Sequence, residues 1–82
     1  MKAHKWNLKT EEYDEIEIPD EAEFYSTDMG LDVKCAQCGI DMIYGFGYTS
    51  RRIHTAFGFG YTVCESCYTK ELKEDGWDGN HL

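Results

Sequence analysis

The sequence lacks any run of apolar residues long enough to span a bilayer, which takes about 20 residues. Its first ten residues are polar and contain no apolar core of the kind that a secretory signal has. We therefore expect a soluble, cytoplasmic protein without a membrane partner. In that compartment thiols stay reduced, which favours metal binding over disulfide formation for the cysteines of the chain.

Basic residues are scarce. Eight lysines and arginines stand against sixteen acids, so the formal net charge is −8. Residues 1–34 carry ten acids and four lysines, whereas residues 35–82 carry six acids and four basic residues. Zinc modules that bind nucleic acid usually present a basic face to the phosphates. The charge therefore argues against a nucleic-acid partner and in favour of a protein partner.

No cysteine lies outside two matched pairs, Cys35-Ala-Gln-Cys38 and Cys64-Glu-Ser-Cys67. Two residues between the members of a pair let both sulfurs of a tight turn point at one centre. Two such turns supply the four thiolates that tetrahedral zinc accepts at about 2.3 Å. The spacing predicts one structural Zn²⁺ bound by the four cysteines. An 82-residue chain forms one domain with a marginal core, and a metal cross-link would stabilise it.

Three other uses of the cysteines compete with zinc binding. Two disulfides would need an oxidising compartment. A thioredoxin-like redox motif has one pair at the start of a helix after a buried strand, not two pairs. Iron in a rubredoxin-like site suits the glycine in Cys35-Ala-Gln-Cys38-Gly39, but Tyr68 follows the second pair. Zinc is the favoured ion, and the choice between zinc and iron stays open.

The N-terminal third reads as a tail followed by a strand. Residues 1–12 are charged and aperiodic, and we expect a flexible tail there. The next six residues alternate between two faces: Tyr13, Glu15 and Glu17 on one, and Asp14, Ile16 and Ile18 on the other. This pattern predicts a half-buried strand, which Pro19 ends because it has no N–H for a ladder. The predicted domain covers residues 13–82, with an acidic strand and turn segment (13–34) and a zinc-finger core (35–76).

An internal repeat lies between the cysteine pairs. Tyr44-Gly-Phe-Gly-Tyr-Thr49 recurs thirteen positions later as Phe57-Gly-Phe-Gly-Tyr-Thr62. In an extended chain each copy has aromatics on one face and glycines on the other, which predicts a hairpin joined through residues 49–55. We favour aromatics that cover the zinc and the core, with glycines admitting a neighbouring segment. The alternative is an exposed aromatic platform for a partner, made of Tyr44, Phe46, Phe57 and Phe59.

A helix is predicted after the repeat. Cys64, Cys67, Tyr68 and Leu72 would share one helical face, and Gly76 would end the helix. The second cysteine pair then lies on its first turn. We expect the tail, residues 77–82, to fold back through Trp77.

The order of a cysteine knuckle, a hairpin and a helix that gives the last two ligands resembles the treble-clef zinc fingers. The resemblance covers residues 31–75 and is carried by Cys35-Ala-Gln-Cys38-Gly39 and Val63-Cys64-Glu-Ser-Cys67-Tyr68. It implies an α+β fold: a small zinc-stabilised treble-clef-like domain, here with an extra N-terminal strand. Cys35 and Cys38 would come from the knuckle, and Cys64 and Cys67 from the helix start. A zinc ribbon, with both pairs on hairpin knuckles, is the alternative architecture.

The sequence offers no catalytic constellation. A four-thiolate zinc leaves no position for a reactive water. The three histidines, His4, His54 and His81, are scattered, and His54 is expected in an exposed loop at the hairpin tip. We therefore expect that the chain is not an enzyme.

The expected function is a protein–protein interaction module, as a monomer or a small homo-oligomer. Its contact surface would include Tyr13, Glu15, Glu17, the four aromatics of the repeat, Arg51 and Arg52. A specific version of this hypothesis is a small phage or mobile-element regulator that inhibits a nucleic-acid-handling enzyme by imitating phosphate charge. The alternative is a nucleic-acid-binding zinc finger that acts through Arg51, Arg52 and the helix lysines Lys70 and Lys73, although the negative charge opposes it.

Overall fold

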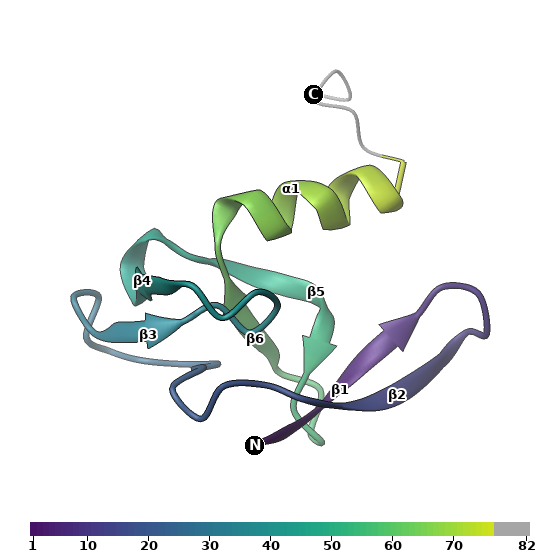
Figure 1. Ribbon diagram of the computed structural model, residues 1–82, viewed down its shortest axis with the longest axis horizontal. Helices are drawn as coiled ribbons and strands as arrows, with labels where there is room; N and C mark the ends of the chain where they lie inside the picture. Colours follow the sequence, from purple (N-terminus) through teal and green to yellow (C-terminus); the bar gives the residue numbers. More distant parts are fainter. Residues whose placement is uncertain (77–82) are drawn as a thin grey trace.

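Two antiparallel sheets and one C-terminal helix make up the computed structural model, which describes residues 1–76 (Figure 1). The four-stranded sheet has the order β2-β1-β5-β6, and the two-stranded sheet pairs β3 with β4. The strands are β1 (Lys2–Asn7), β2 (Glu12–Glu17), β3 (Asp32–Lys34), β4 (Asp41–Ile43), β5 (Tyr48–His54) and β6 (Gly60–Val63). A 3-10 turn, η1 (Tyr44–Phe46), precedes β5, and the helix is α1 (Glu65–Glu74). The predicted α+β class is confirmed.

The N-terminal residues form a strand, so the prediction of a flexible tail over residues 1–12 was wrong. Strand β1 pairs with β2 along its whole length and joins β5 through the pairs His4↔His54 and Lys5↔Ile53. Only Ala3 of this strand is fully buried. The strand is held by backbone pairing on both of its edges, and a search for apolar periodicity does not detect that.

Strand β2 matches the alternation read from the sequence. Ile16 is half-buried and Ile18 is buried, whereas Tyr13, Glu15 and Glu17 are exposed. The strand ends at Glu17, just before Pro19, as predicted. The chain then runs through turns to β3, so residues 13–34 are a strand and turn segment.

The hairpin between the cysteine pairs differs from the prediction. Its strands are β5 and β6, and the connecting turn covers residues 55–59, where Thr55 and Phe59 are joined by a backbone hydrogen bond of 2.8 Å. Residues 49–54 of the expected turn lie inside β5. In the first copy of the repeat, residues 44–46 form the 3-10 turn η1 and only Tyr48 and Thr49 enter β5. The amides of Tyr44 and Gly45 bond instead to the carbonyls of Leu31 and Met29.

A neighbouring segment does approach the repeat closely at a glycine, as the sequence suggested. A Cβ atom on Gly45 would lie 2.7 Å from the carbonyl oxygen of Met29 and 3.0 Å from its Cβ. Backbone cannot move aside as a flexible side chain can, so a larger residue at position 45 would displace the segment that leads into β3.

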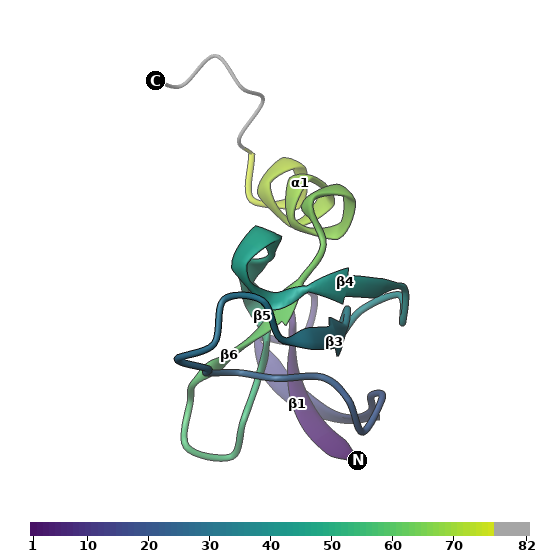
Figure 2. The ribbon, with the colours of Figure 1, turned by 90° about the vertical axis from the view of Figure 1, so that its left-hand side faces the viewer.

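Helix α1 lies along one side of the strands and packs on β5 (Figures 1 and 2). It starts directly after Cys64 and ends at Glu74, two residues before Gly76, close to the predicted bounds. Within residues 1–76 no helix is long and apolar enough to cross a bilayer. The expected folding back through Trp77 lies outside the described residues.

Candidate metal centre

The first cysteine pair lies on the turn between β3 and β4. The amide of Cys35 donates to the carbonyl of Ile40 (2.9 Å), and the amide of Gly39 donates to the carbonyl of Cys35 (2.9 Å). Gly39 has φ of +79°, which glycine adopts without the steric cost that a side chain would bring. This tight turn holds the sulfurs of Cys35 and Cys38 on the side that faces α1.

The second pair lies at the start of α1, as predicted, and not on a second hairpin knuckle. Cys64 is the N-cap residue, with extended backbone, and Cys67 lies buried in the first helical turn. Strand β6 leads into this position, and its last residue, Val63, is fully buried. The packing of β6 therefore fixes where the helix and its two sulfurs begin.

The four cysteines come together although 25 residues separate the pairs. All four Sγ atoms lie within 4.8 Å of one another, and those of Cys38 and Cys64 are 3.8 Å apart. Four sulfurs placed tetrahedrally at about 2.3 Å from one ion would be separated by about 3.8 Å. Each of the four cysteines is free. The group can therefore hold a metal ion, and its all-sulfur donor set is one that zinc and iron both accept.

Backbone amides prepare the cluster for negative charge. The amides of Gln37, Cys38 and Cys64 donate to the sulfur of Cys35 at 3.3–3.5 Å. Burial alone would raise the pKa of the Cys35 thiol. The three amide donors lower it by more than burial raises it, and the resulting pKa is about 7. Burial, together with the neighbouring sulfurs, raises the pKa of Cys67 far above its usual range. One thiol is thus ready to ionise, and the ionisation of Cys67 calls for a nearby cation.

A buried polar group fastens α1 to β5 beside the cysteines. The carboxylate of Glu71 accepts hydrogen bonds from Ser50 Oγ (2.8 Å) and the amide of Arg51 (2.6 Å). Ser50 Oγ in turn accepts from the amides of Arg52 (3.1 Å) and Ile53 (2.9 Å). These residues lie where the register of β5 and β6 is irregular, so side chains satisfy amides that the ladder leaves unpaired. The sequence reading missed both Ser50 and Glu71, although Glu71 lies four residues after Cys67, on the predicted inner face of the helix, and that position was the available signal.

Arg51 and Arg52 are bound to the end of α1 and do not form a free basic patch. Arg51 Nε donates to Asp75 Oδ2 (2.6 Å), and Arg52 Nη2 donates to Asp75 Oδ1. Arg52 is only 5% exposed. Burial alone would raise the pKa of Asp75. The two guanidinium groups lower it by more than burial raises it, so the pKa of Asp75 lies below its usual range. Arg52, which the sequence placed on the partner-contacting surface, is therefore largely enclosed and paired inside the fold, so little of it is available to a partner.

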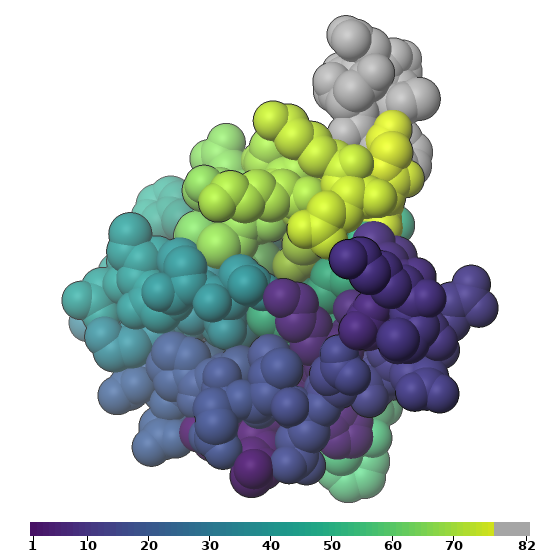
Figure 3. All heavy atoms as spheres, turned by 45° about the vertical axis from the view of Figure 1, so that its right-hand side comes forward, coloured from purple at the N-terminus to yellow at the C-terminus, as the bar shows by residue number. Residues whose placement is uncertain are grey.

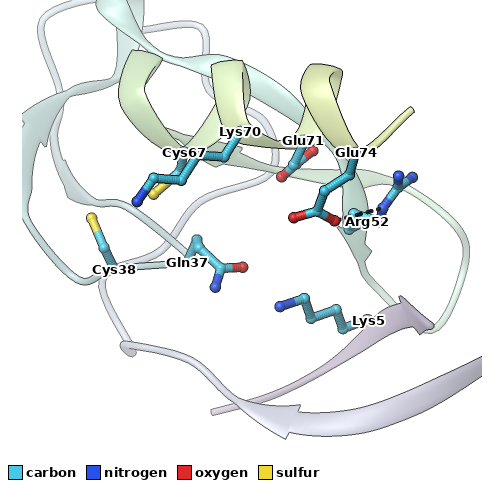
Figure 4. A pocket seen from close by; sticks show the side chains of 8 residues that line it. All are labelled: Lys5, Gln37, Cys38, Arg52, Cys67, Lys70, Glu71 and Glu74. Carbon is cyan, nitrogen blue, oxygen red and sulfur yellow. Dashed lines mark ion pairs between the residues drawn. The ribbon is translucent and has the colours of Figure 1, made fainter. Parts of the chain in front are cut away.

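A cavity of about 190 Å³ lies between the cysteines and the N-terminal hairpin. In Figure 4, Lys70 reaches from α1 toward Cys38, and Glu74 is paired with Arg52, while Gln37 and Lys5 lie on the other side of the cavity. Cys67 and Glu71 complete the lining. Cations and carboxylates are mixed on its walls, and the two cysteines belong to the sulfur cluster.

The aromatics of the repeat do not form one platform. Phe46 and Phe57 are 81% and 89% exposed, and they lie at opposite ends of β5, which spans about 20 Å. Phe59 is 59% exposed and stacks on Phe24 with ring centroids 5.8 Å apart, and Tyr44 is half-buried. The favoured interpretation, in which these rings cover the core, was wrong for the three phenylalanines.

Of the tyrosines in the repeat, only Tyr61 is buried, whereas Tyr48 is 42% exposed. Tyr61 is buried in the core, and Tyr48 stacks on Tyr68 of α1 with ring centroids 4.9 Å apart. These tyrosines occupy the same position in the two copies, and the phenylalanines two residues before them, Phe46 and Phe59, are both exposed.

His54 was expected at an exposed hairpin tip, and that expectation was wrong. It is the last residue of β5, half-buried, with its ring edge-on to Tyr13 at 5.7 Å. Burial lowers the pKa of His54. Its Nδ1 atom is buried, and no hydrogen-bond partner lies among the described residues. The ring therefore serves as packing against β2 in its neutral form.

The chain was also compared with known proteins. Protein-family models, curated proteins and solved structures give no significant match.

Proposed function

We propose that this chain is a non-enzymatic protein–protein interaction module built around one structural Zn²⁺. The observation that carries the proposal is the convergence of four sulfurs from two distant segments within 4.8 Å. A site with four thiolates is closed, since the ion has no position left for a reactive water. The role of the ion would be to join the β3–β4 turn to the start of α1.

The order of elements supports a treble-clef-like arrangement. A cysteine turn between β3 and β4 is followed by the β5–β6 hairpin, and then by a helix whose N-cap and first turn carry the last two cysteines. A zinc ribbon would have its second pair on a hairpin turn, which is not where Cys64 and Cys67 lie. Because this fold hosts many activities, the surface has to define the function.

Surface chemistry favours a protein partner over nucleic acid. Phe46, Phe57 and Phe59 expose large apolar rings, which are common anchors in protein interfaces. The two arginines that would meet phosphates are paired with Asp75, and the net charge is −8. Lys70 and Lys73 alone would offer little against that repulsion.

Metal binding can be tested directly. Native mass spectrometry and metal analysis of the purified chain should give one zinc ion per chain, and Co²⁺ should give the absorption of a tetrahedral thiolate site. Cys67→Ser should lose the ion, whereas the exposed Ser66→Ala on the same helical turn should keep it. A chain that binds no ion, or that keeps its fold when a chelator removes the ion, would contradict the proposal.

The interaction role needs a separate experiment. The immobilised chain should capture a protein partner when nuclease is present throughout the experiment. The Phe57→Glu and Phe46→Glu variants should no longer capture this partner, whereas Ser66→Ala should still capture it. Folding of each variant is checked by its bound zinc and its circular dichroism spectrum. Capture that depends on intact nucleic acid, or that is equal for all variants, would argue against this function.

A further inference from the structure

Strand β2 forms one end of the four-stranded sheet, and among the described residues its only strand partner is β1. Five of its six side chains are exposed. Figure 3 shows the β1–β2 hairpin and the segment that follows it at the front of the molecule, with no later part of the chain lying over them. An uncovered edge strand presents unpaired N–H and C=O groups that can pair with another chain.

The register identifies the backbone groups that face outward. Met1 and Ile18 exchange two backbone hydrogen bonds, both of 2.8 Å, so they form a hydrogen-bonded pair. Hydrogen-bonded and non-hydrogen-bonded pairs alternate along an antiparallel ladder. The next pair, Lys2↔Glu17, is therefore non-hydrogen-bonded, and so are the pairs that contain Glu15 and Tyr13. The amides and carbonyls of Tyr13, Glu15 and Glu17 consequently point away from β1.

The same three residues present their side chains on one face, because residues two apart along a strand lie on the same side. All three are exposed. Lys2 lies opposite and reaches Glu15 at 3.1 Å and Glu17 at 3.4 Å, so the charge there is only partly balanced. Residues 11–23 hold eight acids and no basic residue. One edge therefore combines free backbone groups with strong negative charge.

We propose that the outer edge of β2, defined by Tyr13, Glu15 and Glu17, binds an extended basic segment of a partner protein as an added antiparallel strand. The inference rests on the proposed function and names the partner's chemistry. Backbone pairing provides the attachment, and the side chains at alternate positions provide the specificity. Basic residues two apart would face Glu17 and then Glu15, and an arginine two further on would lie over the ring of Tyr13.

A second copy of the chain is a poor occupant of this edge. Pairing of two β2 strands would place glutamates against acids of the other copy, and like charges directly across a sheet are destabilising. Nucleic acid is repelled for the same reason. A lysine- or arginine-bearing strand is the occupant that turns the charge into an attraction.

The test uses the zinc-loaded full chain and a blocked heptapeptide, acetyl-Thr-Lys-Thr-Lys-Thr-Arg-Thr-amide. On binding, the amide protons of Tyr13, Glu15 and Glu17 should become protected from exchange. Those of Asp14 and Ile16, which already bond to β1, should change little. N-methylation of the peptide lysine that faces Glu15 should weaken binding by about two- to tenfold, since it removes a ladder bond. N-methylation of the adjacent threonine, whose N–H points away, should not.

Charge variants test the side-chain contribution. Glu15→Gln and Glu17→Gln should each weaken binding by about two- to fivefold, the size of an opposite-charge pair across strands. Glu65→Gln, on the exposed start of α1, should leave the affinity unchanged at the same salt concentration.

Several outcomes would overturn the inference. Equal effects of the two N-methyl groups would mean that charge attracts the peptide without strand addition, and unchanged amide exchange at β2 would mean that the edge is not used. If the amides of Tyr13, Glu15 and Glu17 become protected from exchange without peptide, and this protection increases with protein concentration, the occupant of the edge is a second copy of the chain. If the peptide does not bind while zinc is retained and the phenylalanine variants still lose their partner, only this inference fails.

Discussion

Replacing Ser50 with alanine should destabilise the protein far more than the loss of one hydroxyl group suggests. This hydroxyl donates to Glu71 and accepts from the amides of Arg52 and Ile53, and Ser50 is only 3% exposed. Water therefore cannot replace it. Ser50→Ala leaves two buried amides and one carboxylate oxygen without their partner.

The magnitude follows from those orphaned groups. A buried donor or acceptor that loses its partner costs about 1–3 kcal/mol. Glu71 keeps its bond from the amide of Arg51, and small shifts will relieve part of the loss. We therefore expect the free energy of unfolding to fall by about 2–4 kcal/mol, a large part of the roughly 5–15 kcal/mol available to a small domain.

Urea denaturation of the zinc-loaded protein measures the effect. Free zinc has to be buffered at one value for all variants, because an ion that binds only the folded state adds to the measured stability. Ser66→Ala is the matched control, since this serine is exposed on α1 and its replacement should change the free energy by less than about 0.5 kcal/mol. If Ser50→Ala behaves like that control, the hydroxyl does not stabilise the irregular part of β5, and the reasoning is refuted.

Three further predictions concern the ion, the helix end and pH. Chelation of the ion should abolish cooperative unfolding in thermal melts, because structural zinc contributes about 10–16 kcal/mol in zinc-finger peptides, as much as a small domain's whole stability. Asp75→Asn should lower the free energy of unfolding by about 1–3 kcal/mol in urea, since it weakens charged hydrogen bonds to Arg51 and Arg52. Burial lowers the pKa of His54, so the folded state disfavours its protonated form. Stability from neutral His54 is complete above pH 6.5 and is lost as pH falls below it, so wild type should lose more stability than His54→Gln between pH 7.5 and 5.5.

The predictable part of the structure is the part that local patterns encode. The cysteine spacing identified the four residues that come together, and the 3.6-residue spacing after Cys64 gave α1 almost to its bounds. The alternation from Tyr13 to Ile18 gave β2. In each case the signal lies within a few neighbouring residues, and long-range packing did not overrule it.

The missed parts depend on contacts between distant segments. Strand β1 has one fully buried side chain and is defined by pairing with β2 and β5. Arg52 looked like half of a basic pair until the fold placed Asp75 beside it. The two copies of the repeat have similar sequences but different neighbours, and the bond from the amide of Gly45 to the carbonyl of Met29 keeps the start of the first copy out of the hairpin. Sequence periodicity carries no information about such partners.

Helix α1 is fastened at both ends by different chemistry. Cys64 and Cys67 hold its N-terminal end to the β3–β4 turn through the sulfur cluster, whereas Asp75 holds its C-terminal end to β5 through two arginines. In the proposed zinc-bound protein, only the attachment through the cysteines would depend on an ion. Partial loss of the metal should therefore expose the amide of Tyr68, which bonds to the carbonyl of Cys64 at 3.0 Å, to hydrogen exchange before those near Glu71, which the buried hydroxyl of Ser50 still holds. Uniform exposure along the helix would mean that the two fastenings act as one cooperative unit.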